Sequence, residues 1–139
     1  MEKYGLNISS KGKYGLRALA DMAQQGGGAA SIASIAKRQN ISEGYLEQIM
    51  AKLKKAGIVN GVRGAKGGYV LAKEPHKLTC GEILRALESS AEPVECGGLD
   101  GSCTDELCPT KKLWKKINDN YNQIMDSATL ASLLEDSSI

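Results

Sequence analysis

Two short helical patterns separated by a tight turn place the strongest constraint on the fold of this 139-residue chain. The first pattern starts at Ser31 and stops near Asn40, a residue that readily adopts a left-handed backbone. The second starts at Ser42 and stops at Gly57. The serine before each pattern can accept a hydrogen bond from a backbone N–H group of the first turn. This arrangement is typical of a helix-turn-helix.

A longer helix is expected before this motif, over residues 11–25, with Ser10 as its N-terminal cap. Its apolar residues recur about every 3.6 positions, and the glycines at 26–28 stop it. The predicted inward faces of the three helices are, in chain order, Tyr14, Leu16, Leu19, Met22 and Ala23; Ile32, Ile35 and Ala36; and Tyr45, Leu46, Ile49, Leu53 and Ala56.

A glycine-rich hairpin is expected directly after these helices, because residues 58–62 and 68–72 carry β-forming side chains. The tip between them contains Arg63, Gly64 and Lys66. A nucleotide-binding glycine loop is the rival interpretation, but the glycine spacing does not fit G-x-G-x-x-G and no Lys-Ser/Thr pair follows. The two basic residues therefore predict a wing that contacts phosphate or a DNA groove.

The second half of the chain predicts further helices on either side of a cysteine-bearing loop. Thr79 and Glu82 form a capping box that opens a short helix with Ile83, Leu84 and Leu87 facing inward. The predicted division is a winged helix-turn-helix over 1–77, a connecting helix over 78–93, a cysteine loop over 94–109, and a dimerisation helix with its tail over 110–139. The expected fold class is therefore mainly α with a small β-hairpin wing.

The last long helix, expected over residues 110–127, carries a coiled-coil-like apolar seam, and residues 129–135 can add a short leucine-rich helix. The seam consists of Leu113, Ile117, Tyr121, Ile124 and Ala128. So short a chain offers this seam no obvious partner, which favours a second copy related by a two-fold axis. The alternative is that the helix folds back on its own domain.

The net charge of +2 hides an asymmetry between the two halves of the chain. Residues 1–77 hold 13 basic and 5 acidic side chains, a net +8, whereas residues 78–139 hold 5 basic and 11 acidic ones, a net −6. The first half would suit a polyanion such as DNA. Two solvated surfaces of opposite sign are the plainer interpretation.

Several classes of function are disfavoured by what the chain lacks. No run approaches the roughly 18 apolar residues of a membrane-spanning helix. Residues 1–9 lack the apolar core of a signal peptide, so a cytoplasmic protein is expected. The single histidine, His76, makes a histidine-rich metal site or a Ser-His-Asp triad improbable. No acid–base constellation for an enzyme is found.

Three segments carry a resemblance to a known family: SSKGKYGL at 9–16, ISEGYLEQ at 41–48 and VRGAKGGY at 62–69. They resemble the BadM/IscR-type (Rrf-type) bacterial winged-helix regulators, over almost the whole chain. The resemblance implies a homodimeric transcription factor that binds an imperfect palindrome of double-stranded DNA. The family's IscR-like and NsrR-like members are iron–sulfur sensors, and its CymR-like members are cluster-free repressors of cysteine metabolism.

The start of the second short helix would lie closest to the base edges of DNA. Glutamine there can pair bidentately with adenine, and lysines nearby can bind phosphate. By resemblance, Glu47 and Arg63 match the specificity and wing contacts of the family. The alternative for Glu47 is a surface ion pair with Lys11 or a neighbouring lysine. The predicted DNA contacts are Lys11, Ser42, Gly44, Tyr45, Glu47, Gln48, Lys52, Arg63, Gly64 and Lys66.

Three of the four cysteines, Cys96, Cys103 and Cys108, lie in one glycine-rich loop with C-x6-C-x4-C spacing. Cys80 stands apart and is expected to be a small buried apolar residue. Disulfides are disfavoured in the cytosol, and the paired C-x2-C arms of a zinc ribbon are missing. Three thiolates can hold an iron–sulfur cluster with a fourth ligand from elsewhere, and three free thiols are the alternative.

The resemblance places the family's three cluster cysteines in this same loop and thus implies a [2Fe–2S] cluster, with a [4Fe–4S] cluster or none as alternatives. Where IscR-like members have a histidine ligand, this chain has Lys111. His76 precedes the loop and is expected on the surface. The fourth ligand is left open among Asp105, Glu106 and the partner subunit.

The sequence thus predicts a homodimeric DNA-binding regulator that senses iron–sulfur or redox status and controls iron–sulfur or cysteine and sulfur metabolism genes. One alternative is a cluster-free, CymR-like repressor controlled by a metabolite or by a protein of cysteine metabolism or cluster assembly. A zinc-binding adaptor protein is an alternative of another class.

Overall fold

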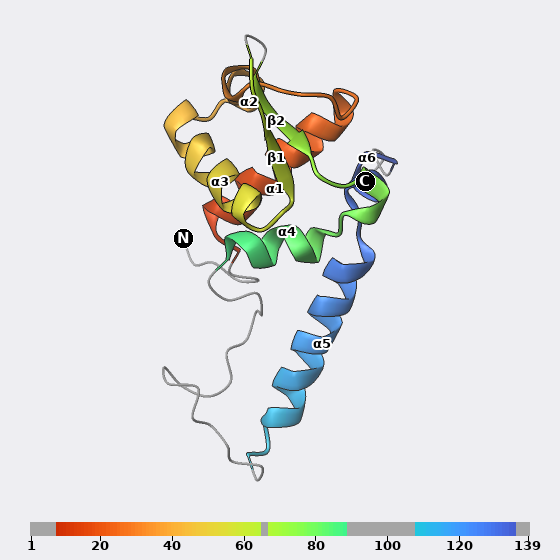
Figure 1. Cartoon of the computed structure of the whole chain (residues 1–139). Coiled ribbons are helices and arrows are strands. Elements are labelled where there is room, and N and C mark those ends of the chain that lie inside the picture. The colour runs from red at the N-terminus through yellow and green to blue at the C-terminus, as the bar shows by residue number, and fades with distance from the viewer. Residues whose placement is uncertain (1–7, 65–66, 89–107, 136–139) are drawn as a thin grey trace.

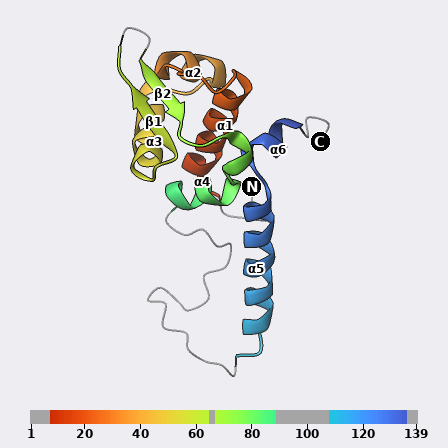
Figure 2. The ribbon, with the colours of Figure 1, turned by 45° about the vertical axis from the view of Figure 1, so that its right-hand side comes forward.

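The computed structural model describes residues 8–64, 67–88 and 108–135. Its elements are α1 (Ser10–Gln24), α2 (Ile32–Gln39), α3 (Glu43–Lys55), β1 (Val59–Val62), β2 (Gly68–Leu71), the 3-10 helix η1 (Pro75–Lys77), α4 (Cys80–Leu87), α5 (Lys111–Ser127) and α6 (Leu130–Glu135). All of these except α5 form one head, from which α5 projects as a rod (Figures 1 and 2). The predicted fold class, mainly α with a small hairpin wing, is confirmed.

The helices of the head start where short polar side chains can cap them. Ser31, Ser42 and Thr79 each accept a hydrogen bond from the backbone N–H three residues on, as the sequence predicts. The prediction that Ser10 caps α1 is wrong. Ser9 is the cap, because its backbone is extended and its Oγ accepts from Gly12 N–H at 3.2 Å, so Ser10 is already helical.

Left-handed residues end α2 and α3, as predicted. Asn40 has a φ of 54° and Gly57 a φ of 79°. After α3, Ile58 N–H donates to the carbonyl of Leu53 and Gly57 N–H to that of Lys54, which is the Schellman arrangement. Ala56, predicted to face inward, is exposed because it is the terminal cap of α3, where the chain leaves its helical path.

The two strands of the wing form an antiparallel pair in which Val59 lies opposite Leu71 and Val62 opposite Gly68. The pair is extended on its β2 side by Ala30, which exchanges two backbone hydrogen bonds of 2.8 Å with Tyr69. A Cβ at position 68 would collide with the carbonyl of Ala30, so this close approach needs glycine. The base of the wing is thereby fastened to the loop between α1 and α2.

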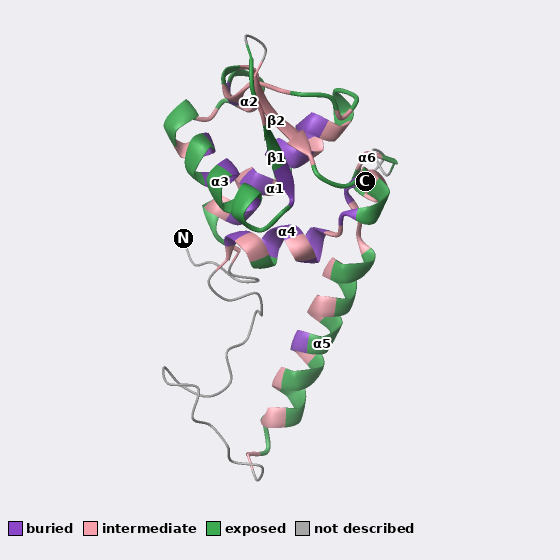
Figure 3. Cartoon of the chain, viewed as in Figure 1, coloured by how far each residue is buried: buried purple, intermediate pink, exposed green. Residues whose placement is uncertain are grey.

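One hydrophobic core lies between the helices of the head (Figure 3). Its fully buried large side chains are Leu19, Met22, Ile35, Leu46, Ile49, Met50, Leu53, Val59, Leu78, Ile83 and Leu130. Leu78 precedes α4, Ile83 lies in α4 and Leu130 lies in α6. These segments therefore share one core with the helix-turn-helix. No helix in the described part of the chain is long and apolar enough to cross a membrane.

The packing of α4 on α1 depends on two glycines of α1. A Cβ at Gly15 would collide with Leu87, and one at Gly12 would collide with the carboxylate of Glu88 and crowd Leu84. Both glycines are buried. The two helices can therefore lie close together, which brings the end of α4 to the start of α1.

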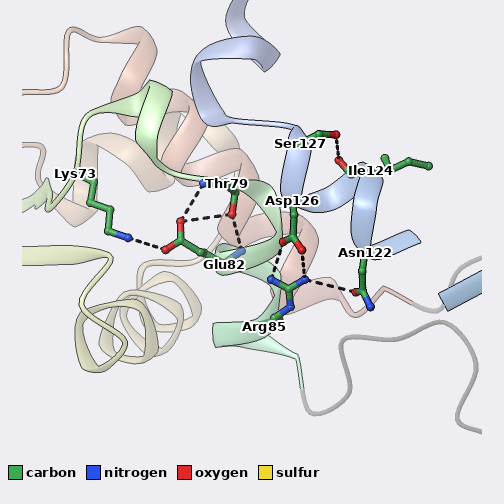
Figure 4. A network of polar contacts seen from close by, with 8 residues as sticks. All are labelled: Lys73, Thr79, Glu82, Arg85, Asn122, Ile124, Asp126 and Ser127. Atoms are coloured by element: carbon green, nitrogen blue, oxygen red, sulfur yellow. Dashed lines mark hydrogen bonds and ion pairs between the residues drawn. The ribbon is translucent and has the colours of Figure 1, made fainter. Parts of the chain in front are cut away.

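Helix α5 is joined to α4 by polar contacts (Figure 4). The Arg85 guanidinium donates to both carboxylate oxygens of Asp126, at 2.7 and 2.9 Å, and also to Asn122 at 3.5 Å. On another side of α4, the Glu82 carboxylate completes the predicted capping box with Thr79 and accepts from Lys73 at 2.6 Å. The rod is thus attached to the head by the Arg85–Asp126 ion pair and by the chain that follows it, where Cys80 N–H donates to the Ala128 carbonyl at 2.8 Å and Leu130 N–H to that of Leu78 at 2.9 Å.

Candidate nucleic-acid interface

The first half of α3 presents a row of exposed polar positions. Ser42, Gly44, Glu47 and Gln48 are exposed, while Leu46 of the same helix is fully buried. The core therefore fixes which face of α3 points outward. That face carries an amide, a carboxylate and a hydroxyl, the groups that read base edges in a major groove.

Tyr45, the remaining predicted contact of α3, is half-buried. Its ring meets that of Tyr14 of α1 edge-to-face, with centroids 5.9 Å apart and planes 80° apart. The guanidinium of Arg17 lies 5.3 Å from the Tyr14 ring centroid, within range of a cation–π contact. Tyr45 thus also holds α3 against α1.

A lysine-lined groove lies between the start of α1, the end of α3 and the end of α4. Its volume is about 710 Å³, and its lining includes Lys11, Lys52, Lys55 and Glu88. Lys11 and Lys52 line the groove together, and the nearby Lys11 ammonium lowers the pKa of Lys52 below its usual value. Two ammonium groups so close together form an arrangement that a phosphate would stabilise. The structure therefore brings two predicted phosphate contacts together.

Glu47 is exposed on α3. Among the residues that the structure describes, none forms an ion pair with Glu47. The alternative role for Glu47, a surface ion pair with Lys11, is therefore not seen. Its carboxylate is available to accept from a cytosine N4 amino group.

Beyond β1, the described part of the wing carries two of the predicted contacts. Arg63 and Gly64 are exposed there, and the φ of 122° at Gly64 favours glycine. Gly67 N–H donates to the Gly64 carbonyl at 2.9 Å. Lys66, the other predicted wing contact, lies outside the described residues.

Of the predicted metal ligands, only Cys108 lies within the described residues, and Cys96 and Cys103 lie outside them. Cys108 precedes α5, and its Sγ is 3.1 Å from Thr110 Oγ1. The same oxygen accepts from Trp114 Nε1 at 3.0 Å, so the hydroxyl proton of Thr110 remains available to the sulfur. This environment fits a sulfur that acts as an acceptor, as a thiolate ligand does.

Cys80 and His76 lie where the sequence predicts them. Cys80 is buried, and burial raises the pKa of its thiol. His76 is exposed on the surface, 3.3 Å from Glu74. Within 8–64, 67–88 and 108–135, no three His, Cys, Asp or Glu side chains gather in a way that could hold a metal. Asp105 and Glu106, the candidate fourth ligands, fall outside these ranges.

Several residues around these sites were not found from the sequence. Ser9, Lys55 and Glu88 line the groove, and Thr110 and Trp114 adjoin Cys108. The short spacing of Cys108 and Thr110 could have revealed their contact. Nothing local to Glu88 indicates its contact with residues 79 positions earlier.

A helix-turn-helix with an exposed second helix, adjoining lysines and a basic wing defines a DNA-binding regulator of the winged-helix class. Residues 8–136 match the Rrf2 family, described as an iron-dependent transcriptional regulator. The chain belongs to this family, and it is a transcriptional regulator rather than an enzyme, as its named relatives are.

The relatives are similar to this chain along nearly their whole length. The transcriptional regulator CymR of Bacillus subtilis is 43% identical, with 92% of this chain and 89% of that protein covered. The solved structure of that global cysteine regulator has a TM-score of 0.83 at 42% identity and covers 96% of this chain and 99% of its own. The structure of T. potens IscR has a TM-score of 0.78 at 45% identity, covering 96% and 89%.

Proposed function

We propose that this regulator is a homodimer that reads an imperfect palindrome with its two copies of α3, and that an iron–sulfur cluster on Cys96, Cys103 and Cys108 controls its affinity for DNA. Its targets would be genes of iron–sulfur or of cysteine and sulfur metabolism. The observation that carries the DNA part is the exposed start of α3, on a helix whose last turn brings Lys52 into one groove with Lys11. The description of the family as iron-dependent supports the cluster part.

The DNA part assigns different tasks to different side chains. Gln48 and Glu47 read base edges, whereas Lys11, Lys52 and Lys66 bind phosphate. Binding is measured by fluorescence anisotropy, over a range of salt concentrations, on a duplex that the protein selects from a random pool and on a scrambled duplex. Gln48→Ala should mainly reduce the preference for the selected duplex. Lys66→Ala should weaken binding to both duplexes and flatten the salt dependence by about one unit. Equal losses on both duplexes for both variants would contradict the assignment.

The homodimer rests on the apolar side chains that α5 and α6 expose. Leu113 is 51% exposed, Ile124 63% and Leu133 40%. A second copy packed along α5 would cover residues of the predicted seam. Two-fold symmetry would then place the two α3 helices so that they meet half-sites roughly 34 Å apart on one face of the duplex.

The cluster part rests on three cysteines of one segment. Cys108, the one that lies within the described residues, has surroundings that suit a thiolate ligand. Cys108 Sγ lies 3.1 Å from Thr110 Oγ1, and this hydroxyl can donate its proton to the sulfur because its oxygen accepts from Trp114 Nε1. Hydrogen bonds to a ligating sulfur favour its thiolate form and raise the cluster's reduction potential. When bound, a cluster would supply one-electron redox chemistry and sensitivity to iron and oxygen.

To test the cluster part, the protein is purified without oxygen. Its visible absorption spectrum and its iron, sulfide and zinc contents are then measured. Charge-transfer bands with matching iron and sulfide, lost in Cys108→Ala and kept in Cys80→Ala, would support the cluster. Apo and loaded protein should then differ in affinity for the selected duplex at fixed salt. Equal affinities would contradict control by the cluster.

A cluster-free regulator is the second candidate, and the 43% identity to CymR favours it. The position after the third loop cysteine at which IscR-like proteins are expected to have histidine also holds Lys111 here. A colourless, metal-free protein that binds its selected duplex at full strength would establish this candidate. Its controlling signal would then be sought among protein partners and small metabolites.

A further inference from the structure

Glu88 connects two parts of the head that are distant in sequence. It follows the last turn of α4, and its Oε1 accepts from both the backbone N–H and the hydroxyl of Ser9, each at 2.9 Å. The two residues are 79 positions apart. The end of α4 is thereby tied to the residue that caps α1.

Ser9 has two tasks in this contact. Its Oγ accepts the N–H of Gly12 and so satisfies one of the free donors of the first turn of α1, while its own proton goes to Glu88. The orientation of the Ser9 hydroxyl is therefore fixed by both partners, Gly12 and Glu88. A carboxylate at this place also interacts favourably with the positive end of the α1 dipole. Glu88 thus determines how the first turn of α1 starts.

The space for the Glu88 carboxylate exists only because residue 12 is glycine. A Cβ there would fall on Glu88 Oε1 and lie 3.1 Å from Leu84 Cδ2. Glu88 also lies near α5, since its charge adds to burial in raising the pKa of Tyr121. The carboxylate is therefore held at a junction of α1, α4 and α5.

Glu88 lines the same groove as the lysine pair. Lys11 lies in the first turn of α1, two residues after the cap, and lines the groove together with Lys52 of α3. Any change in the start of α1 therefore moves Lys11 relative to Lys52. A single phosphate can meet both ammonium groups only while they stay adjacent.

We propose that Glu88 is a positioning residue for DNA binding, which holds the first turn of α1 so that Lys11 and Lys52 share one backbone phosphate. This inference rests on the DNA part of the proposed function. The negative charge of Glu88 itself repels phosphate. Its charge and its geometry therefore act in opposite directions on DNA affinity, and substitutions can separate them.

The experiment compares Glu88→Gln with Glu88→Ala, by anisotropy on the selected and scrambled duplexes at several salt concentrations. Glutamine keeps an oxygen that accepts both donors of Ser9 and lacks the charge, so it should bind both duplexes as tightly as wild type or a few-fold tighter. Alanine removes the acceptor. It should weaken binding to both duplexes about tenfold at low salt and reduce the salt slope by about one unit, the value for one phosphate.

Lys11→Ala and the double variant Lys11→Ala/Glu88→Ala complete the cycle. Because Glu88 acts through Lys11, the double variant should bind no more weakly than Lys11→Ala alone. Thermal unfolding and circular dichroism check that each variant is folded. If Glu88→Ala does not fold, Ser9→Ala removes one of the two donors and should show a smaller loss in the same direction.

Three results would overturn the proposal. The first is a salt slope that is unchanged in Glu88→Ala. The second is a double variant whose loss of DNA affinity equals the sum of the two single losses. The third is equal affinity of the Gln and Ala variants, which would indicate that only the charge of Glu88 matters. Wild-type protein that shows no salt-dependent DNA binding would overturn the proposed function as a whole. The two failures are thus distinguishable.

Discussion

The head and the rod α5 use apolar side chains in opposite ways. In the head, Leu19, Leu46 and Leu53 are completely buried in one core. In α5, Leu113 and Ile124 are more than half exposed, and most of this helix is coloured as exposed or intermediate in Figure 3. Yet the apolar residues of both regions follow a helical repeat in the sequence. The comparison teaches that periodicity predicts an apolar face without showing whether the same chain covers it.

The contrast also indicates where stability comes from. The head buries its own core and can hold its fold without another chain. The rod contributes no fully buried large side chain to that core, and its Arg85–Asp126 pair with the head is exposed, so this pair contributes little to stability. We therefore expect changes in the head to alter unfolding at any protein concentration, and changes in the seam of α5 to act through association.

The largest effect is expected for Leu19→Ala in the core of the head. The truncation should lower the free energy of unfolding by about 3 kcal/mol, because it leaves a cavity in a fully buried position. Urea denaturation followed by circular dichroism measures this change. Gln24→Ala, a truncation at an exposed position of the same helix, is the control and should cost less than about 0.5 kcal/mol. Equal losses would contradict the contrast between buried and exposed positions.

The next effect is expected for Ile124→Asp in the rod. A carboxylate in the seam should weaken dimerisation about 100-fold, because it would be desolvated without a partner. Analytical ultracentrifugation measures the dissociation constant, and anisotropy should show a parallel loss of affinity for a palindromic duplex. Gln123→Asp, at the neighbouring exposed position outside the seam, should leave both values near those of wild type. An unchanged dimer in Ile124→Asp would place the interface elsewhere.

A smaller effect is expected for the capping box of α4. The hydrogen bond from Lys73, then that from the Thr79 N–H group, lowers the pKa of Glu82. Since the folded-state pKa is the lower one, this stabilisation is complete above the unfolded value of about 4 and is lost as the pH falls through the folded value. Glu82→Ala should cost about 1 kcal/mol at neutral pH.

Glu82→Gln serves as the matched control, because glutamine can complete a capping box without a charge. It should retain most of the stability and lack the acid-dependent loss seen for wild type. Urea denaturation at pH 7 and pH 3 measures both quantities. If the glutamine variant lost as much stability between pH 7 and pH 3 as wild type, the loss would come from other carboxylates.

The smallest effect is expected where the head meets the rod. A double-mutant cycle with Arg85→Ala and Asp126→Ala should give a coupling of at most about 1 kcal/mol, since both side chains are largely exposed. The Arg85 hydrogen bonds lower the pKa of Asp126, so the coupling should fade at acidic pH. Lys115→Ala, whose partner Asp119 lies within α5, should show no coupling with Asp126→Ala.

Local signals made most of the fold predictable. Ser31, Ser42 and Gly57 are recognisable because their effect depends on neighbours only a few residues away. The cap of α1 was misplaced by one residue because Ser9 and Ser10 are equally good caps by type. Only the contact of Ser9 with Glu88, far along the chain, distinguishes them.

The site was predictable to the extent that it lies on one helix. The exposed residues of α3 follow from its apolar repeat, since the core fixes the outward face. The groove does not follow in this way, because Lys11, Lys52 and Glu88 come from three helices whose packing depends on buried glycines. Composition and periodicity carry no information on such contacts.

Trp114 gives the chain an intrinsic optical reporter. It is the only tryptophan of the protein, so emission excited at the red edge of the indole band comes from one ring. Its Nε1–H group donates a hydrogen bond to the Thr110 hydroxyl, whose oxygen also lies 3.1 Å from Cys108 Sγ. Iron or oxidation at Cys108 should therefore change the intensity of this emission, and the state of the sulfur can be followed in unlabelled protein while it binds DNA.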